Sequence, residues 1–392
     1  MSGSDVGATT MSSAQRDRVL PTYARADLTI VRGEGCRVWD DAGRSYLDFG
    51  TGLAVTGLGH CHPGAVAAAR EQLGLLWHAS NLYWTEPMLR LAALLSERMG
   101  GAQAFFCNSG AEANEAAIKY ARKATGRPRV VALEGGFHGR TFGALSATGQ
   151  PPKWEGFGPL VPGMSFAAPN EVETLERAVS PGGELALILL EPVLGEGGVI
   201  PLEEGFVAAA AEIAREVGAL LCADEVQAGM GRTGTFFAHE QLGLEPDLVT
   251  LAKGLGNGLP IGALLAADRA PRGFAPGDHG ATFGGNPVAA AAACAVVEAI
   301  DDELLQNVRE RGEQLAAGLR PLPGVTGVRG RGLLLGATLD REAAGVVDAC
   351  REAGLIVLSA GPDVLRLAPP LVVSADEVSE ALDAVAGALA AG

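Results

Sequence analysis

The stretch LALILLEP, from Leu185 to Pro192, decides the fold class of this chain. Six consecutive apolar residues precede the acid Glu191, which is typical of a strand buried on both faces, as in a parallel sheet covered by helices. Short apolar runs and amphipathic helices alternate around this stretch from about residue 103 to residue 266. The alternation predicts an α/β domain whose sheet is mostly parallel.

The predicted sheet has seven candidate strands, and helices lie between several of them. After these strands, an alanine-rich helix begins near Pro287, because proline is natural at a helix start. The remaining residues mix short strands with helices, which predicts a smaller α+β domain. Ser374 and Glu377 form a capping-box pattern at the start of its last helix. The seven candidate strands are AQAFFCNS (102–109), RVVALEG (129–135), MSFAAP (164–169), LALILLEP (185–192), ALLCADE (219–225), DLVTLAK (247–253) and IGALLAAD (261–268).

The length of the chain, 392 residues, exceeds the size at which one hydrophobic core suffices, so we expect two compact units. We predict an N-terminal segment at residues 1–60 that packs with the small domain. The large domain is predicted at residues 61–286 and the small domain at residues 287–392. Hydrophobic residues make up 48% and charged residues 19% of the chain, which is the composition of a globular enzyme.

The net charge of the chain excludes some classes of binding partner, and its cysteines indicate the cellular compartment. A net charge of −16 argues against nucleic acid or an anionic membrane as a partner, because phosphate backbones need a basic surface. No apolar run is long enough to cross a membrane, and the first sixteen residues lack the apolar core of a secretory signal, so we interpret them as a frayed end. The six cysteines are scattered without paired spacing, which indicates a reduced, cytoplasmic protein.

Polar residues follow several of the predicted strands, where parallel sheets bind their ligands. Ser109, Gly110 and Ala111 open a helix whose free amides and dipole favour an anion such as phosphate. Asp224 directly follows a buried strand and could face a ligand, and Glu191 occupies the same position after another strand. Local sequence leaves simpler alternatives open, because Ser109 could serve only as a helix cap and each acid only as a loop cap.

Lys253 is the sharpest signal, because it ends the apolar strand DLVTL and precedes a glycine-rich turn. A lysine beside an apolar wall has a lowered pKa, which frees a nucleophilic amine. Such an amine reacts with aldehydes. Pyridoxal 5′-phosphate needs an anion cradle, an acid for its pyridine nitrogen and a lysine for its aldehyde, so the combination of Ser109, Asp224 and Lys253 favours this cofactor.

Two other kinds of site are less consistent with the sequence. The stretches KGLGNGLPIG and GRGLLLG resemble dinucleotide-binding loops, but both miss the required glycine spacing and the strand, turn and helix order. A nicotinamide or flavin oxidoreductase is therefore disfavoured. The motif GHCHP, from Gly59 to Pro63, has no further cysteine or histidine cluster to complete a metal site, so we expect no metal there and interpret it as a loop before a helix.

Eight motifs, in this order, resemble the class III, fold type I aminotransferases that use pyridoxal 5′-phosphate, and among them the acetylornithine aminotransferases. The resemblance covers nearly the whole chain. It implies a transaminase (class 2.6.1) with a large α/β domain, a small domain and a homodimer with shared active sites. The motifs are GHCHP, FFCNSGAEANEAAIK, FHGRT, EPVLGEGG, DEVQAGMGRTG, LAKGLGNGLPIGA, TFGGNP and LRLAPPL.

The resemblance implies roles in cofactor binding. Lys253 matches the lysine that bonds to the cofactor's aldehyde, Asp224 the acid at the pyridine nitrogen, and Gln227 the residue near the ring hydroxyl. Phe137 matches the aromatic residue that stacks on the ring. Thr282 matches a phosphate contact that comes from the partner subunit. The phosphate cup of the family matches Ser109, Gly110 and Ala111.

The resemblance also implies roles toward the substrates. Arg140 matches the residue that binds the substrate carboxylate, Arg366 resembles a second carboxylate-binding arginine, and Glu196 resembles its reversible partner. Leu53 stands where ornithine aminotransferases carry tyrosine, and its apolar side chain fits an acylated donor better than a charged α-amino group. We therefore expect transfer of the terminal amino group of N2-acetyl-L-ornithine to 2-oxoglutarate, a step of arginine biosynthesis. Ornithine, succinylornithine and 4-aminobutyrate stay open as alternative donors.

Overall fold

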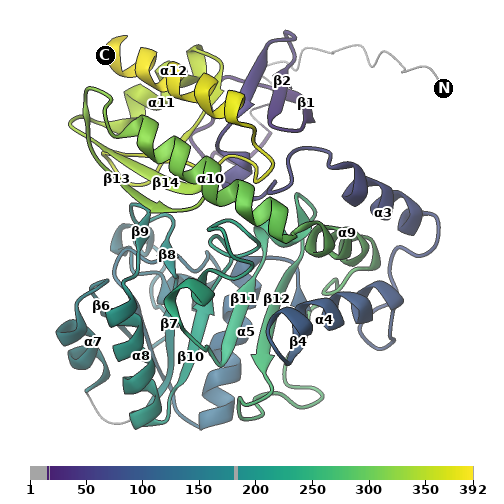
Figure 1. Cartoon of the computed structure of the whole chain (residues 1–392). Coiled ribbons are helices and arrows are strands. Elements are labelled where there is room, and N and C mark those ends of the chain that lie inside the picture. Colours follow the sequence, from purple (N-terminus) through teal and green to yellow (C-terminus); the bar gives the residue numbers. More distant parts are fainter. Residues whose placement is uncertain (1–15, 17, 181–183, 392) are drawn as a thin grey trace.

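The computed structural model describes residues 16, 18–180 and 184–391 of the chain. The predicted frayed end, residues 1–16, lies outside these residues except for Arg16. A central sheet with helices on both faces forms the lower part of the molecule in Figure 1, and a smaller sheet with its own helices lies above it. Among the described residues, no helix combines the length and the apolar character needed to cross a membrane.

The seven predicted strands form one sheet in the order β4-β12-β11-β10-β7-β5-β6. Neighbouring strands are parallel except at β12, which is antiparallel to both β11 and β4. The prediction of a mostly parallel sheet is therefore confirmed. The strands are β4 (Ala102–Cys107), β5 (Arg129–Leu133), β6 (Met164–Ala167), β7 (Leu185–Leu190), β10 (Leu220–Asp224), β11 (Leu248–Leu251) and β12 (Gly262–Ala267).

The central strands are buried on both faces because helices cover each side of the sheet. In β7, Leu187 and Leu189 belong to the hydrophobic cluster that includes helix α5 (Gly110–Thr125), whereas Ile188 belongs to the cluster of α7 (Val172–Val179) and α8 (Glu204–Val217). Successive side chains of a strand point to opposite faces, so a strand covered on both sides has no polar face. This explains the uninterrupted apolar run of LALILL.

Helices and short elements lie at the rim of the central sheet. Helix α9 (Pro287–Ala299) begins at the predicted proline and packs against α3 (Pro63–Leu73) and α4 (Glu86–Arg98). His62 of the GHCHP motif accepts a hydrogen bond from the amide of Ala65 and thereby caps α3, so this loop does lead into a helix. The remaining elements here are α2 (Thr51–Ala54), α6 (Phe142–Ala147), η1 (Pro151–Lys153), β8 (Val193–Leu194), β9 (Ile200–Pro201), η2 (Ala238–Leu242) and η3 (Lys253–Gly256).

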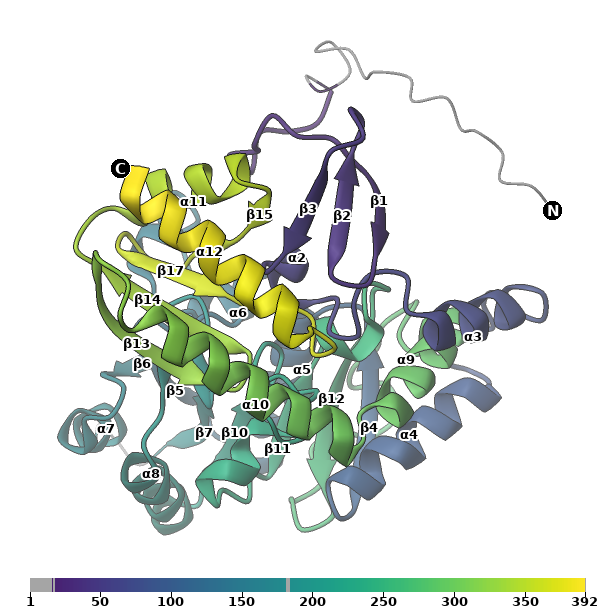
Figure 2. The same ribbon diagram turned by 45° about the horizontal axis from the view of Figure 1, so that its top comes forward.

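The C-terminal part forms a second sheet in the order β13-β14-β17-β16, against which three helices pack (Figure 2). N-terminal strands form a third sheet, to which the C-terminal β15 adds in parallel with β3. The domain boundaries at residues 60 and 286 stay a prediction. The elements are β1 (Ile30–Glu34), β2 (Arg37–Asp40), β3 (Ser45–Asp48), α10 (Asp302–Leu319), β13 (Val325–Arg331), β14 (Leu334–Leu339), α11 (Ala343–Glu352), β15 (Leu355–Ile356), β16 (Leu358–Ser359), β17 (Val364–Leu367) and α12 (Ala375–Ala391).

The predicted capping box is present at the start of α12. The amide of Glu377 donates to Oγ of Ser374 over 3.2 Å, and the amide of Ser374 donates to the Glu377 carboxylate over 2.9 Å. Each side chain satisfies an amide that the helix leaves free.

Candidate active site

A cavity of about 400 Å³ brings together segments that follow the strands β4, β5, β7, β10 and β11. This is the carboxyl edge of the sheet, where parallel sheets bind ligands. Eight predicted site residues line the cavity, whereas Glu196, Arg366, Thr282 and Leu53 are not among its lining residues. The eight are Ser109, Gly110, Ala111, Phe137, Arg140, Asp224, Gln227 and Lys253.

One end of the cavity is the start of helix α5. Oγ of Ser109 accepts a hydrogen bond from the amide of Glu112 over 3.2 Å. Ser109 therefore caps the helix, which was one of the two roles that the sequence left open. It also lines the cavity together with Gly110 and Ala111, whose first-turn amides have no partner within the helix. A Cβ atom on Gly110 would lie only 2.6 Å from Cγ1 of Val226. Glycine is required here because the loop after β10 lies directly against the helix start.

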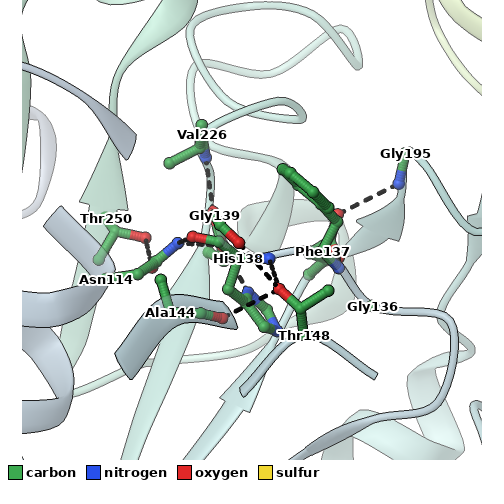
Figure 3. Close-up of polar contacts among 12 residues, drawn as sticks. Asn114, Gly136, Phe137, His138, Gly139, Ala144, Thr148, Gly195, Val226 and Thr250 are labelled. Carbon is green, nitrogen blue, oxygen red and sulfur yellow. Dashed lines mark hydrogen bonds and ion pairs between the residues drawn. The ribbon is translucent and has the colours of Figure 1, made fainter. Parts of the chain in front are cut away.

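A buried network holds the carboxylate of Asp224. Its Oδ2 accepts hydrogen bonds from Nδ2 of Asn114 and Nδ1 of His138, each over 2.7 Å, and its Oδ1 accepts one from the amide of Val226 over 3.0 Å. Asn114 is held in turn by the Thr250 hydroxyl, which donates to its Oδ1 over 2.9 Å (Figure 3). These contacts fix the direction of the carboxylate and leave it little freedom to rotate.

His138 supports Asp224 from a fully buried position. Burial alone would lower the pKa of the imidazole, but the hydrogen bond to Asp224 and the charge of that acid outweigh burial and raise the pKa above its ordinary value. The amide of His138 donates to Oγ1 of Thr148 over 3.0 Å, which fixes the backbone behind the ring (Figure 3). Nε2 of His138 is buried without a hydrogen-bond partner.

Glu191 is a second buried acid, and it orders two loops of the cavity. Its carboxylate accepts hydrogen bonds from the amide of Phe137 over 2.7 Å and from the amide of Gly195 over 3.2 Å. Burial raises the pKa of Glu191 to about 7, while the charge of His138 opposes this and that of Asp224 adds to it. Glu191 therefore connects the Phe137 loop to the loop that carries Glu196.

Lys253 lies at the end of β11, in backbone geometry that lysine rarely adopts. Its φ is +43°, in the left-handed region that favours glycine. Burial lowers the pKa of its ammonium to about 8, partly opposed by the charge of Glu196. Among the residues that the structure describes, none forms a hydrogen bond or an ion pair with its side chain. An amine that gives up its proton more readily than an ordinary lysine therefore lines the cavity.

Arg366 and Glu196 lie next to this cavity and contact it through Gln227. The guanidinium of Arg366, only 2% exposed, donates to Oε1 of Glu196 over 2.6 Å and to Oε1 of Gln227 over 3.2 Å. Burial would raise the pKa of Glu196, but the charge and hydrogen bond of Arg366 outweigh it and lower that pKa. Nε of Arg366 is buried and has no hydrogen-bond partner in residues 16, 18–180 and 184–391, so this cation has donor capacity left.

Of the other predicted site residues, Arg140 lines the cavity, whereas Leu53 and Thr282 do not. Arg140 lies above the ring of Phe137, with its guanidinium carbon 5.7 Å from the ring centroid, and Lys153 lies 5.4 Å from the same ring. Leu53 is 44% exposed and lies two residues before Val55, which does line the cavity. Thr282 is exposed in a turn outside the cavity of its own chain. The structure thus does not bring Thr282 or Leu53 into contact with this cavity.

Sequence reasoning missed His138 and Asn114, and it gave Glu191 only as a lone acid after a strand. His138 belongs to the quoted motif FHGRT and Asn114 to GAEANEA, but neither motif indicates a contact with an acid 86 or 110 residues away. A polar residue on a buried helix face, such as Asn114 on α5, was the one signal available.

Comparisons with known proteins agree with this geometry. The family model Aminotransferase class-III matches residues 21–389. The acetylornithine aminotransferase of Thermosynechococcus vestitus is 48% identical, with 95% of each chain covered. That of Corynebacterium efficiens is also 48% identical, again with 95% of each chain covered.

Two solved structures share the fold. An ornithine aminotransferase from Toxoplasma gondii, with pyridoxal 5′-phosphate at partial occupancy in its active site, has a TM-score of 0.92 at 32% identity and covers 96% of this chain and 93% of its own. The N-acetylornithine aminotransferase from Stenotrophomonas maltophilia has a TM-score of 0.81 at 41% identity and covers 94% and 97%. This chain belongs to the class-III aminotransferases.

Proposed function

We propose that this protein transfers the terminal amino group of N2-acetyl-L-ornithine to 2-oxoglutarate and releases N-acetyl-L-glutamate 5-semialdehyde and L-glutamate. The observation that carries the proposal is one cavity with the low-pKa amine of Lys253, the fixed carboxylate of Asp224 and the open helix start at Ser109. Relatives at 48% identity over nearly the full length carry the name of this activity. The name of these relatives, acetylornithine aminotransferase, also supports a role of this protein in arginine biosynthesis.

The donor set of the cavity fits pyridoxal 5′-phosphate, which the T. gondii structure contains. Ser109, Gly110 and Ala111 would hold its phosphate through backbone amides and a hydroxyl. Asp224 would hold its ring nitrogen, and Lys253 its aldehyde. When bound, this cofactor supplies an aldehyde for amine exchange and a ring that withdraws electrons from the reacting carbon. Further contacts to the ring are assigned to Phe137 and Gln227.

Lys253 is assigned the proton transfers of the reaction. With a pKa lowered to about 8, Nζ can accept a proton from the substrate carbon that bears the transferred amino group and can return it as a general acid. The Asp224 carboxylate stays in one position because His138, Asn114 and Val226 donate to it. It therefore stabilises positive charge at the ring nitrogen position without reorganising.

The pair of Arg366 and Glu196 is assigned to the recognition of two different substrates. Glutamate brings two carboxylates, whereas the acetylated donor brings one carboxylate and a neutral amide. Arg366 prefers a bidentate carboxylate partner, so it can exchange Glu196 for a ligand, while Arg140 holds the other carboxylate. Replacing Glu196 with alanine is expected to slow the half-reaction with acetylornithine more than that with glutamate. Two unchanged half-reactions in stopped-flow kinetics would exclude this exchange.

Ornithine is the second candidate donor, because the overall shape of the chain is at least as close to an ornithine aminotransferase. The TM-score is 0.92 for the T. gondii enzyme and 0.81 for the S. maltophilia enzyme, although the latter has the higher sequence identity. Leu53 does not line the cavity of its own chain, but it lies two residues before the cavity-lining Val55. We assign it to selection of the acylated donor, since it offers no hydrogen-bonding group to a charged α-amino group. The fold therefore does not separate the donors, and side chains near Val55 must do so.

The donor assignment is tested with a panel of amines and 2-oxoglutarate, with glutamate formation as the readout. Acetylornithine is expected to give the highest kcat/KM, ahead of succinylornithine, ornithine and 4-aminobutyrate. Replacement of Leu53 with tyrosine is expected to shift this ratio toward ornithine. A higher kcat/KM for ornithine in the wild type would overturn the donor assignment, and no glutamate from any amine would overturn the proposed function.

We also propose a cytoplasmic homodimer that shares its active sites. Support comes from a surface around Thr282 that exposes large aromatic side chains: Trp77 is 68%, Trp84 79% and Phe283 59% exposed. The two segments of this surface are joined by Asn81, whose Nδ2 donates to the carbonyls of Ala281 and Gly284. Contiguous exposed apolar surface is typical of a subunit interface. All six cysteines are free thiols, as in a reduced compartment.

Shared sites are tested by co-expressing two inactive chains, one with Lys253→Ala and one with Thr282→Glu. If Thr282 serves the partner's site, a mixed dimer contains one site with both residues intact, and activity returns. No recovery, or a monomer mass by light scattering, would contradict the proposal.

A further inference from the structure

A second cavity, of about 350 Å³, lies away from the proposed active site, between the loop after β10 and the small domain. Its walls come from Thr233–Thr235, from Gln241 in η2, from one face of α10 and from the end of β13. Figure 1 shows β13 just above β8 and β9, at the junction between the two larger parts of the molecule. No residue of the proposed active site lines this cavity.

Four arginines line this second cavity, and the periodicity of their elements brings them together. Arg329 and Arg331 are two positions apart in β13 and therefore point to the same side of the strand. Arg309 comes from α10, where Gly312, Glu313 and Ala316 share its helix face, and Arg320 directly follows the last residue of that helix. The one acidic side chain in the lining is Glu313, which pairs with Arg320.

The other three guanidinium groups contact only neutral oxygens among the residues that the structure describes. Nε of Arg329 donates to the carbonyl of Gly198 over 2.6 Å. Arg309 donates to the carbonyl of Gly234 and to Oε1 of Gln306. The Arg331 guanidinium donates to the carbonyl of Leu202 over 3.2 Å. Neutral acceptors satisfy some N–H groups but carry no charge. Glu310 interacts electrostatically with Arg309 without forming an ion pair, and Arg329 and Arg331 form no ion pair among the described residues.

Arg309, Arg320 and Arg329 are exposed and Arg331 is half-buried, so an anion in solution can reach the cluster. Two observations favour such an anion. The chain has 46 acidic and only 30 basic residues, so acids were available in excess to pair with these arginines. In addition, Nε of Arg331 is buried and has no hydrogen-bond acceptor among the described residues, so the structure leaves this cation incompletely satisfied. A bound anion would relieve the repulsion among the cations.

We propose that this cavity binds a small anion with at least two negative groups, of the phosphate or polycarboxylate class. Arg329 and Arg331 on β13 face such an anion from one wall and Arg309 on α10 from another. Planar guanidinium groups match both phosphate and carboxylate oxygens, and the cavity exceeds the volume of a single water many times over. The site is independent of the transamination chemistry.

The experiment measures the affinity of the holoenzyme for pyrophosphate and, separately, for citrate by titration calorimetry in a buffer without other multivalent anions. The wild type is expected to bind at least one of them, and the affinity should fall when about 0.5 M salt screens the charges. The double substitution Arg329→Gln and Arg331→Gln is expected to weaken binding at least about tenfold. Replacement of the same two residues with lysine keeps the charge and should retain part of the affinity.

Arg215→Gln is the control, because Arg215 is exposed on α8, pairs with Glu212 and lies outside this cavity. It removes one positive charge, as Arg309→Gln does. It is expected to bind like the wild type. Should the β13 double variant fail to fold, Arg309→Gln tests the opposite wall with the same readout. Equal affinity in wild type and cavity variants, an equal loss in Arg215→Gln, or no binding of either anion by the wild type would overturn the proposal.

Discussion

The two ends of the proposed active site hold their charged groups in opposite ways. Three donors fix the carboxylate of Asp224, and one of them, His138, is itself anchored by Thr148. The amine of Lys253 has no such partner among the described residues, and burial lowers its pKa to about 8. The acid end can therefore stabilise a fixed charge, while the amine end can move, react and exchange a proton. The following predictions test this division.

The largest effect is expected from Lys253→Ala at the free end. Removing the amine removes both the nucleophile and the proton carrier, so kcat for glutamate formation should fall at least about a thousandfold. Lys153→Ala is the matched control, because Lys153 also has a pKa lowered by burial and lies near Phe137. Its loss should be much smaller. Similar losses in the two variants would mean that Lys253 has no special role.

A smaller but still large loss is expected from Asp224→Asn at the fixed end. The amide keeps the size of the side chain but loses the charge and has only one acceptor oxygen for three donors. We expect kcat to fall about a hundredfold or more, from the lost electrostatic stabilisation. The thermal midpoint of unfolding should fall as well, because buried donors lose their charged acceptor, so kcat is measured well below that midpoint. Retention of near wild-type kcat would contradict the role assigned to this acid.

His138→Gln is expected to have a moderate effect, because His138 acts through Asp224. The variant leaves Oδ2 of Asp224 with the Asn114 hydrogen bond and a weaker second donor. We expect a roughly tenfold fall in kcat with little change in KM, and a shifted pH profile of kcat. A profile identical to that of the wild type would indicate that His138 serves only the packing of the loop.

The smallest effect is expected on the free energy of unfolding. It comes from Glu191, whose carboxylate accepts hydrogen bonds from the loops of Phe137 and Gly195. Its pKa is raised to about 7 in the folded chain and lies near 4.3 when unfolded. Between these values the folded state binds more protons, so the contribution of Glu191 to stability falls as the pH rises from about 4.3 through 7. Relative to Glu191→Gln, the wild type should lose on the order of 1–3 kcal/mol over this range.

Denaturant unfolding of both proteins at several pH values measures this difference. Glu134→Gln provides the control, because Glu134 is exposed on the same stretch after β5. The difference in free energy of unfolding between Glu134→Gln and the wild type should stay nearly constant from about pH 4.3 to 7. If the difference for Glu191→Gln is constant as well, the pKa of Glu191 is not raised in the folded chain.

The sequence predicted most of the fold because the local pattern and the tertiary environment agree there. LALILL reads as a strand buried on both faces, and its residues do alternate between two helical layers. Pro287 and the pair of Ser374 and Glu377 mark helix starts through contacts within a few residues. The cavity-lining positions of Ser109, Asp224 and Lys253 follow from the rule that parallel strands end at one edge.

The sequence could not predict which side chains complete the site. His138 and Asn114 contact Asp224 across 86 and 110 residues of chain. A pattern within a few residues of sequence cannot indicate contacts over such separations. The same holds for the second cavity, where arginines from β13 and α10 meet only because the two elements pack together.

By itself, the sequence determined the layers of the fold, the helix starts and the residue types at the sheet edge, because these depend on periodicity and short-range hydrogen bonds. Only the tertiary structure decided that Asp224 is fixed and Lys253 is free. It likewise decided that Arg366 has Glu196 as its partner, while Arg329 and Arg331 have no negatively charged partner within the described part of the chain. The reason is that the pKa and the reactivity of a side chain depend on burial and on neighbouring charges, which distant segments supply.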